Sequence, residues 1–181
     1  PDEGFILDTL NFSGGSTYVA GILPSDNKAR WGECRGINNS ASLAQYYMTA
    51  NATATTIAAT STAVKIAGTT TSASVTQRFT NTSNRATYAG AISSEFRVSA
   101  VFSANSGNNH QVGVYIAKNG TILPESFILI TTNAGGRAEA GVAQTIVALE
   151  DTDYIEIFVM NETSITDVTV TELNVIVEAL K

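Results

Sequence analysis

The stretch "EFRVSAVFS", residues 95–103, alternates large apolar residues with polar or small ones. Phe96, Val98, Ala100 and Phe102 fall on one face of an extended chain. Successive side chains of a β-strand point to opposite faces of a sheet, so this pattern predicts a strand with one buried face.

Downstream, "VYIAKNGTIL" (114–123) predicts a β-hairpin. Val114 and Ile116 lie on one face of an extended chain and Tyr115 on the other. Asn119-Gly120 suits a type I′ turn, because that turn needs positive φ at both central residues. Thr121 then begins the return strand.

Strand signals recur at the short spacing typical of an all-β sandwich or barrel. "GVAQTIVALE" (141–150) fits either helical or strand spacing, and the glycines at 135–136 with the strand-rich context favour a strand. No stretch of the body carries a capped helix of convincing length, so we expect an all-β, antiparallel domain. The further expected strands are "SVTQRFT" (74–80), with Val75, Gln77 and Phe79 on one side; "SFILITT" (126–132); "DYIEIFVMN" (153–161), with Ile155, Ile157 and Val159 on one face; and "VTVTELNVIVEAL" (168–180), with Val168, Val170 and Glu172 opposite Thr169, Thr171 and Leu173.

Residues 50–77 are almost low-complexity, rich in Thr and Ala with scattered Ile and Val. Thr and β-branched residues favour extended chain, so we interpret the segment as strand material, with disorder as the alternative. Within it, "TAVKIAG" places Val64 and Ile66 inward and Lys65 outward.

The composition indicates a chain that covers much of its own surface by self-association. The 181 residues (19.0 kDa) form one domain, or one domain with an arm, and only 14% are charged, against about 25% in typical proteins. The alternative is an ordinary monomer with a polar, uncharged Thr face. A net charge of −6 argues against nucleic acid as a ligand, and no window has the roughly 18 apolar residues needed to span a membrane.

Charge is unevenly distributed along the chain. Residues 27–118 hold eight basic and two acidic residues, whereas residues 150–181 hold eight acidic residues and Lys181. Either the subunit has opposite charge at its two ends, which favours stacking, or strands from both stretches interleave and the asymmetry disappears. We favour interleaving.

The first 35 residues differ from the rest and predict an N-terminal arm, followed by a β-sandwich over residues 36–181. They include "SGGS" (13–16), the only Trp (Trp31) and the only Cys (Cys34). Trp31 is expected either to anchor the arm on a partner or to fill the domain core. A single Cys excludes an intramolecular disulfide. The start of the sequence does not resemble a signal peptide, so we expect a complete chain made in the cytoplasm.

The sequence contains no GxGxxG, GxxxxGK(S/T), CxxC or HExxH motif, and we expect no enzyme, no cofactor and no metal. A glycosidase-type pair of carboxylates is an open alternative, with few candidates because Glu95 is the single carboxylate between Gly36 and Pro124. His110 is the only His, and it lies in a Gly/Asn-rich turn, where no third group is positioned to orient it. We expect it to be a solvated loop residue or a contact on a symmetry axis. "EDTDYIE" (150–156) could gather Ca²⁺ ligands, but its spacing is not that of an EF-hand. We favour a turn there, with Glu156 facing solvent.

Four segments between residues 60 and 180 follow one another in a recognisable order. They are Thr87-Tyr88-Ala89-Gly90; Phe96, Val98 and Ala100; Ile116, Lys118, Asn119 and Gly120; and Asp153, Tyr154, Ile155, Glu156, Val159 and Asn161. With these segments, residues 60–180 resemble the jelly-roll domains of tailed-phage structural proteins, which are similar to the trimeric TNF/C1q sandwich. Ala89 and Thr152 replace residues of that pattern, and the position of Thr152 is a Gly in the family.

The resemblance implies an antiparallel jelly roll that associates as a homotrimer. We expect a capsid decoration (cement) protein on the outer surface of a phage head, made in the host bacterium and bound to the major capsid protein or another virion protein. The alternative is a receptor-binding fibre tip that recognises host glycans through exposed aromatics. Tyr46, Tyr47 and Tyr88 are candidates for that role and equally for the core. A bacterial C1q-like surface protein ranks third. The residues expected to anchor the arm on the capsid are Phe5, Phe12, Arg30, Trp31 and Arg35.

Overall fold

The computed structural model describes residues 10–12, 16–18, 42–133 and 137–180. The chain divides into two compact units, residues 1–40 and 41–181. In the first unit, β1 (Leu10–Phe12) and β2 (Ser16–Tyr18) pair as an antiparallel hairpin. The predicted arm lies almost entirely outside the described residues and stays a prediction.

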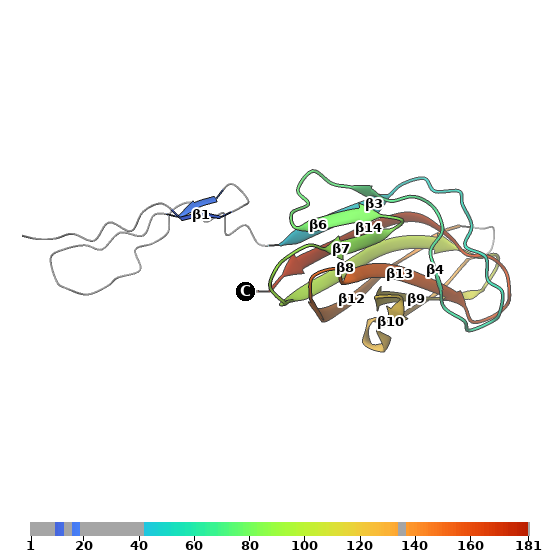
Figure 1. The fold of residues 1–181 in the computed structure, drawn as a ribbon. Helices are drawn as coiled ribbons and strands as arrows, with labels where there is room; N and C mark the ends of the chain where they lie inside the picture. The colour runs from blue at the N-terminus through green and yellow to red at the C-terminus, as the bar shows by residue number, and fades with distance from the viewer. Residues whose placement is uncertain (1–9, 13–15, 19–41, 134–136, 181) are drawn as a thin grey trace, which may run out of the picture. The chain divides into compact units, whose positions relative to one another are not determined.

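Two antiparallel sheets form the second unit and lie one over the other (Figure 1). A short 3₁₀ turn, η1 (Pro124–Ser126), joins β10 to β11, and the described residues contain no α-helix. Sheet 1 has the order β10 (Thr121–Ile122), β9 (Gln111–Lys118), β13 (Tyr154–Asn161), β7 (Arg85–Tyr88) and β6 (Phe79–Thr82), with β11 (Ile128–Thr131) also paired to β9 and β4 (Val64–Lys65) to β13. Sheet 2 has the order β12 (Glu139–Leu149), β8 (Ser94–Asn105), β14 (Thr169–Ala179), β3 (Leu43–Met48) and β5 (Thr71–Ser72).

Most neighbouring strands come from distant parts of the chain, as in a jelly roll. In sheet 2 the last strand, β14, lies between β8 and β3. In sheet 1, β13 lies between β9 and β7. The predicted antiparallel jelly roll is therefore the observed fold, and the segment whose helix or strand character was open is the eleven-residue strand β12.

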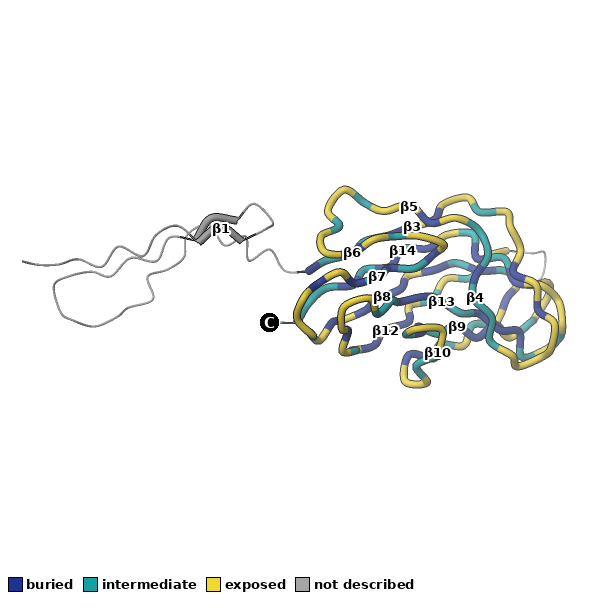
Figure 2. The backbone as a smooth tube through the Cα atoms, viewed as in Figure 1, coloured by how far each residue is buried: buried dark blue, intermediate teal, exposed yellow. Residues whose placement is uncertain are grey.

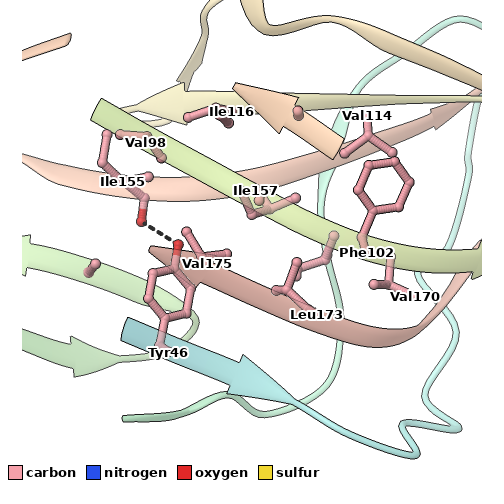
Figure 3. Close-up of a cluster of buried hydrophobic side chains, with 14 of the residues drawn as sticks. Tyr46, Val98, Phe102, Val114, Ile116, Ile155, Ile157, Val170, Leu173 and Val175 are labelled. Atoms are coloured by element: carbon pink, nitrogen blue, oxygen red, sulfur yellow. Dashed lines mark hydrogen bonds between the residues drawn. The ribbon is translucent and has the colours of Figure 1, made fainter. Parts of the chain in front are cut away.

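The core lies between the inner faces of the two sheets (Figure 3). The four residues predicted to be buried on β8 are at most 2% exposed; they are Phe96, Val98, Ala100 and Phe102. Those on β13, Ile155, Ile157 and Val159, face them from sheet 1 and are equally buried. Burying such side chains contributes about 25 cal/mol per Å² of apolar surface, so this double layer is the main source of stability.

Tyr46 and an aromatic cluster complete the core. The Tyr46 hydroxyl donates to the carbonyl oxygen of Ile155 across the sandwich at 3.5 Å (Figure 3). Burial raises the pKa of Tyr46 well above its ordinary value, and the nearby Glu156 carboxylate raises it further. Phe79, Tyr88 and Phe96 pack with ring centroids 5.0–5.4 Å apart, a separation typical of favourable aromatic contacts.

The predicted hairpin is confirmed. Lys118 pairs with Thr121, and the turn residues Asn119 and Gly120 have φ values of +52° and +78°. Both values are positive, as the type I′ turn requires.

Two strand predictions are wrong in detail. In 74–80, only Phe79 and Thr80 belong to a strand, and Val75 is 49% exposed in the preceding loop. In 168–180, the register shifts between Val170 and Glu172. A β-bulge places an extra residue in one strand and reverses the faces beyond it, so Leu173 is buried and Glu172 is exposed.

Residues 50–77 form mostly loop, with only β4 and β5 as strands. Many of its residues are exposed (Figure 2), yet it is tied to both sheets. β4 pairs with β13 of sheet 1, and Thr55 exchanges backbone hydrogen bonds of 2.7 and 3.1 Å with Val168, just before β14 of sheet 2. Ile57 and Ile66 are buried at 3% and 2% exposure. The segment therefore bridges the two sheets along one side of the sandwich.

Interleaving of the strands removes the charge asymmetry within the described residues, as we favoured. Each ion pair joins a basic residue from the middle of the sequence to an acidic residue from its end. The pairs are Lys65–Glu156 (3.0 Å), Arg85–Glu156 (2.7 Å), Arg97–Glu178 (3.2 Å) and Lys118–Asp153 (2.7 Å).

Candidate functional site

The five predicted capsid-anchor residues cannot be assigned a site from the structure. Phe5, Arg30, Trp31 and Arg35 lie outside the described residues, as does Cys34. Phe12 is the last residue of β1. Their predicted role stays a prediction.

The outer face of sheet 2 carries a row of exposed apolar side chains. Strand pairing aligns Val142 of β12 with Val101 of β8, Val101 with Asn174 of β14, and Asn174 with Tyr47 of β3. Val142, Val101 and Tyr47 are 44%, 48% and 37% exposed. Ile146, four residues further along β12, is 60% exposed. We call these four residues and Asn174 the sheet 2 patch.

Uncharged polar side chains continue this face. Gln144 donates to the Ser99 hydroxyl at 3.2 Å, and Gln45 Nε2 donates to the side-chain oxygen Oδ1 of Asn174 at 3.1 Å. These bonds hold the polar side chains flat against neighbouring strands. A groove includes part of this row: it is lined by Tyr47, Val101 and Asn174 of the patch, and also by Thr49, Ala140 and the charged Glu172.

Charge lies at the margins of this surface. Arg97 of β8 pairs with Glu178 of β14 at 3.2 Å, and both side chains are about half exposed. An exposed pair of this kind contributes about 0–1 kcal/mol. An apolar centre with a polar margin is the usual composition of a protein–protein interface.

The outer face of sheet 1 is different, because ionic groups pack tightly on it. Glu156 was predicted to face solvent and this is wrong: it is 1% exposed. Its Oε1 atom accepts from Arg85 Nε at 2.7 Å and from Lys65 Nζ at 3.0 Å. These side chains come from β7 and β4, the strands that pair with β13, and they cover the carboxylate. Arg85 also lies over the Tyr154 ring, 4.4 Å from its centroid. The hydrogen bond and the charge of Glu156 raise the pKa of Arg85.

Apolar residues on sheet 1 mostly pack on one another. The rings of Tyr115 and Phe127 stack with centroids 4.8 Å apart. A Cβ atom on Gly113 would lie 2.7 Å from Phe127 and 2.8 Å from Met160, so the missing side chain lets both residues close over β9. Phe127 is still 36% exposed, and Leu129 on the neighbouring strand β11 is 45% exposed, so this face carries a smaller exposed apolar area of its own.

Asp153 fastens the β9–β10 hairpin to the turn before β13. Its carboxylate accepts hydrogen bonds from the Glu150 backbone N–H at 2.9 Å and from Asn119 Nδ2 at 2.6 Å, and Lys118 Nζ lies 2.7 Å away. Desolvation opposes ionisation of this carboxyl, but the three donors outweigh it and lower the pKa of Asp153 from 3.8 to about 2. The acidic segment 150–156 is therefore a turn at residues 151–152 followed by the first residues of β13.

Thr152 in this turn has a φ of +72°. Its backbone N–H donates to the Tyr88 carbonyl at 2.9 Å. A β-branched residue is strained in this region, so the turn keeps the conformation that a Gly would favour.

His110 lies half-buried among loops at one end of the sandwich. Its Nδ1 atom is 3.3 Å from Asn161 Nδ2 and 3.5 Å from the Ser164 hydroxyl. Both neighbours are uncharged, unlike the carboxylate that orients a catalytic His. The expectation of a solvated loop residue holds in part.

Within the described ranges, no three His, Cys, Asp or Glu side chains gather where they could hold a metal ion. The same ranges contain no helix with the length and hydropathy needed to cross a membrane.

The aromatics considered for glycan recognition are mainly core residues. Tyr46 and Tyr88 are 1% and 2% exposed, and the Tyr88 hydroxyl donates to the Ile92 carbonyl at 3.0 Å. Only Tyr47 of the three reaches the surface, and it belongs to the sheet 2 patch rather than to a loop.

The sheet 2 patch was not predicted, although the sequence contains a signal for it. Val101 lies at the polar phase of an alternating strand, between the buried residues Ala100 and Phe102. Val142 and Ile146 lie at the corresponding phase of β12. Apolar residues at outward positions of adjacent strands indicate a covered outer face, but their adjacency depends on a pairing that only the structure gives.

Comparison with known proteins supports the fold. Murine APRIL matches with a TM-score of 0.52 and 7% identity, covering 76% of this chain and 98% of the APRIL chain. Eiger TNF from S. frugiperda matches with a TM-score of 0.51 and 10% identity, covering 78% of this chain and 93% of the Eiger chain. The chain therefore has the TNF-like jelly-roll fold.

Other comparisons add no function. The PRD1 vertex protein P5 gives a TM-score of 0.46 at 11% identity, covering 77% of this chain and 96% of its own, a score too low to support an inference. No family model matches the sequence, and no curated protein matches it.

Proposed function

We propose that this chain is a non-enzymatic structural protein of a phage particle, which associates as a homotrimer and decorates the outside of the head. The observation that carries the proposal is the sheet 2 patch on a TNF-like sandwich. Val101, Val142 and Ile146 expose apolar surface on a flat sheet face, and an exposed apolar patch with a polar margin is typical of a surface that a partner covers.

The partner that best fits this face is another copy of the chain. Threefold symmetry closes such an assembly without leaving a free interface. Self-association also accounts for the low charge content of the sequence, 14%. The resemblance of residues 60–180 to phage jelly-roll domains supports the virion part of the proposal.

The test is binding of the full chain to phage heads prepared without it. After sedimentation, we expect the chain to pellet with the heads at a saturable ratio and to raise the temperature at which the heads open. Replacing Trp31 with Ala, together with Arg30→Ala, is expected to weaken head binding while the mass of the free protein in solution stays the same.

Two results would contradict the proposal. Failure to bind heads at any concentration would remove the decoration role. Binding to isolated bacterial surface glycans instead, abolished by Tyr47→Ala, would favour the receptor-binding alternative.

A further inference from the structure

The tip of the β9–β10 hairpin holds Asn119-Gly120, the single Asn-Gly pair in the sequence. Gly has no side chain to obstruct the approach of its backbone nitrogen to the preceding side-chain amide. We propose that Asn119 is the deamidation site of this chain, and that Asp153 suppresses the reaction while the hairpin tip is fastened to β13.

The reaction needs only water. The backbone nitrogen of Gly120 loses its proton and attacks Cγ of Asn119, forming a C–N bond. The tetrahedral intermediate expels the side-chain nitrogen as ammonia and leaves a five-membered succinimide. Water then adds to one of the two ring carbonyls and breaks a C–N bond, which yields aspartate or isoaspartate at position 119.

The fold holds both ends of the reacting amide. Oδ1 of Asn119 accepts from the Tyr154 backbone N–H at 2.9 Å, and Nδ2, the departing nitrogen, donates to Asp153 Oδ1 at 2.6 Å. The Asn119 backbone N–H also donates to the Tyr154 carbonyl at 3.0 Å. Ring closure rotates the side-chain amide and removes the nitrogen that Asp153 binds, so these bonds have to break first.

Charge at the tip opposes the same step. Negative charge develops as the Gly120 nitrogen is deprotonated and as the intermediate forms at Cγ of Asn119, whose amide nitrogen contacts the Asp153 carboxylate. A like charge next to the reacting amide disfavours the anion. The nearby cation, Lys118 Nζ, is bound to Asp153 at 2.7 Å, so it is not free to stabilise the anion.

Aspartate or isoaspartate at position 119 cannot form the hydrogen bond with Asp153 that slows the reaction. A carboxylate at position 119 has no N–H to donate to Asp153, and two carboxylates then face each other at the hairpin tip. Deamidation at this position is therefore expected to loosen the hairpin from β13, and the loosening is permanent.

The test is peptide mapping by mass spectrometry of the full chain incubated at pH 7.4 and 37 °C. In the folded protein, we expect conversion at Asn119 to be slower by about tenfold or more than in the urea-unfolded chain, since a hydrogen bond to a charged group has to be lost. Asp153→Ala is expected to recover part of this difference, because the two bonds between Asn119 and the Tyr154 backbone remain. Asp151→Ala, in the same turn, is expected to leave the rate unchanged.

A second pair of variants separates local release from general unfolding. Ile157→Val destabilises the core of the same strand and should not accelerate the reaction. N119D should lower stability, and adding Asp153→Asn should restore part of the loss. Equal rates in the folded and unfolded chain, or a rate that Asp153→Ala leaves unchanged, would overturn the proposal.

Discussion

Replacing Asp153 with Asn is expected to destabilise the domain at neutral pH and to have almost no effect in acid. The substitution keeps the size of the side chain and removes its charge. In the fold that charge interacts with Lys118 Nζ at 2.7 Å, Asn119 Nδ2 at 2.6 Å and the Glu150 N–H at 2.9 Å.

The magnitude follows from the pKa of Asp153, which is about 2 in the fold against an ordinary value of 3.8. Each pKa unit corresponds to about 1.4 kcal/mol, so the ionised group contributes about 2 kcal/mol. A carboxyl whose pKa is lowered by folding stabilises the protein fully above its unfolded pKa, and this stabilisation disappears as the pH falls through the folded pKa. The difference between wild type and Asp153→Asn should be about 2 kcal/mol at pH 7, about 1 kcal/mol at pH 3 and close to zero below pH 2.

The assay is urea unfolding followed by circular dichroism at pH 7, 5, 4, 3 and 2, at one fixed protein concentration because an oligomer's stability depends on it. Asp151→Asn is the matched control, and it should change stability by less than about 0.5 kcal/mol at every pH. A difference for Asp153→Asn that does not vary with pH, or that is absent at pH 7, would refute the role assigned to this charge.

Two further predictions concern the turns next to β13 and β8, each measured by urea unfolding at pH 7. Thr152→Gly should stabilise the domain by about 0.5–1 kcal/mol, because it relieves about 1–2 kcal/mol of left-handed strain at φ +72° and loses part of this gain to the greater freedom of Gly in the unfolded chain. Thr152→Ala should stabilise the domain less. A lower stability of Thr152→Gly would contradict the strain assigned to this residue. Gly90→Ala should destabilise by about 1–3 kcal/mol, because the new Cβ would lie 2.0 Å from the Tyr88 hydroxyl and displace it from its bond to the Ile92 carbonyl; an unchanged stability would show that the buried ring moves aside at no cost.

The sequence was sufficient to predict the elements whose side chains alternate regularly. Phe96 and Val98 on β8 and Ile155 and Ile157 on β13 are buried as expected, because both faces of a strand are specified by its own residues. The Asn119-Gly120 turn was equally predictable, since its chemistry is local.

The failures depended on contacts that no local pattern contains. The β-bulge between Val170 and Glu172 reverses the faces of β14. Glu156 is buried because Arg85 and Lys65, far away in the sequence, lie on adjacent strands of its sheet. Residues 50–77 have a composition that favours strands, but few of them find a partner strand.

The candidate site was missed for the same reason. Val101 alone is an ordinary exposed residue, and it becomes part of a surface only because β12, β14 and β3 align Val142, Asn174 and Tyr47 with it. The predicted anchors in residues 1–35 are a separate hypothesis, which the described residues do not address.

The most direct test of self-association through sheet 2 is the mass of the full chain in solution, measured by light scattering for wild type, Val101→Glu and Val75→Glu. Both valines are about half exposed, at 48% and 49%, but Val75 lies outside the sheet 2 patch. We expect wild type and Val75→Glu to have three times the 19.0 kDa chain mass, and Val101→Glu to be a monomer, because burying an unpaired carboxylate in the interface is costly. A monomeric wild type, or a Val101→Glu variant that stays as large as the wild type, would contradict self-association through this face.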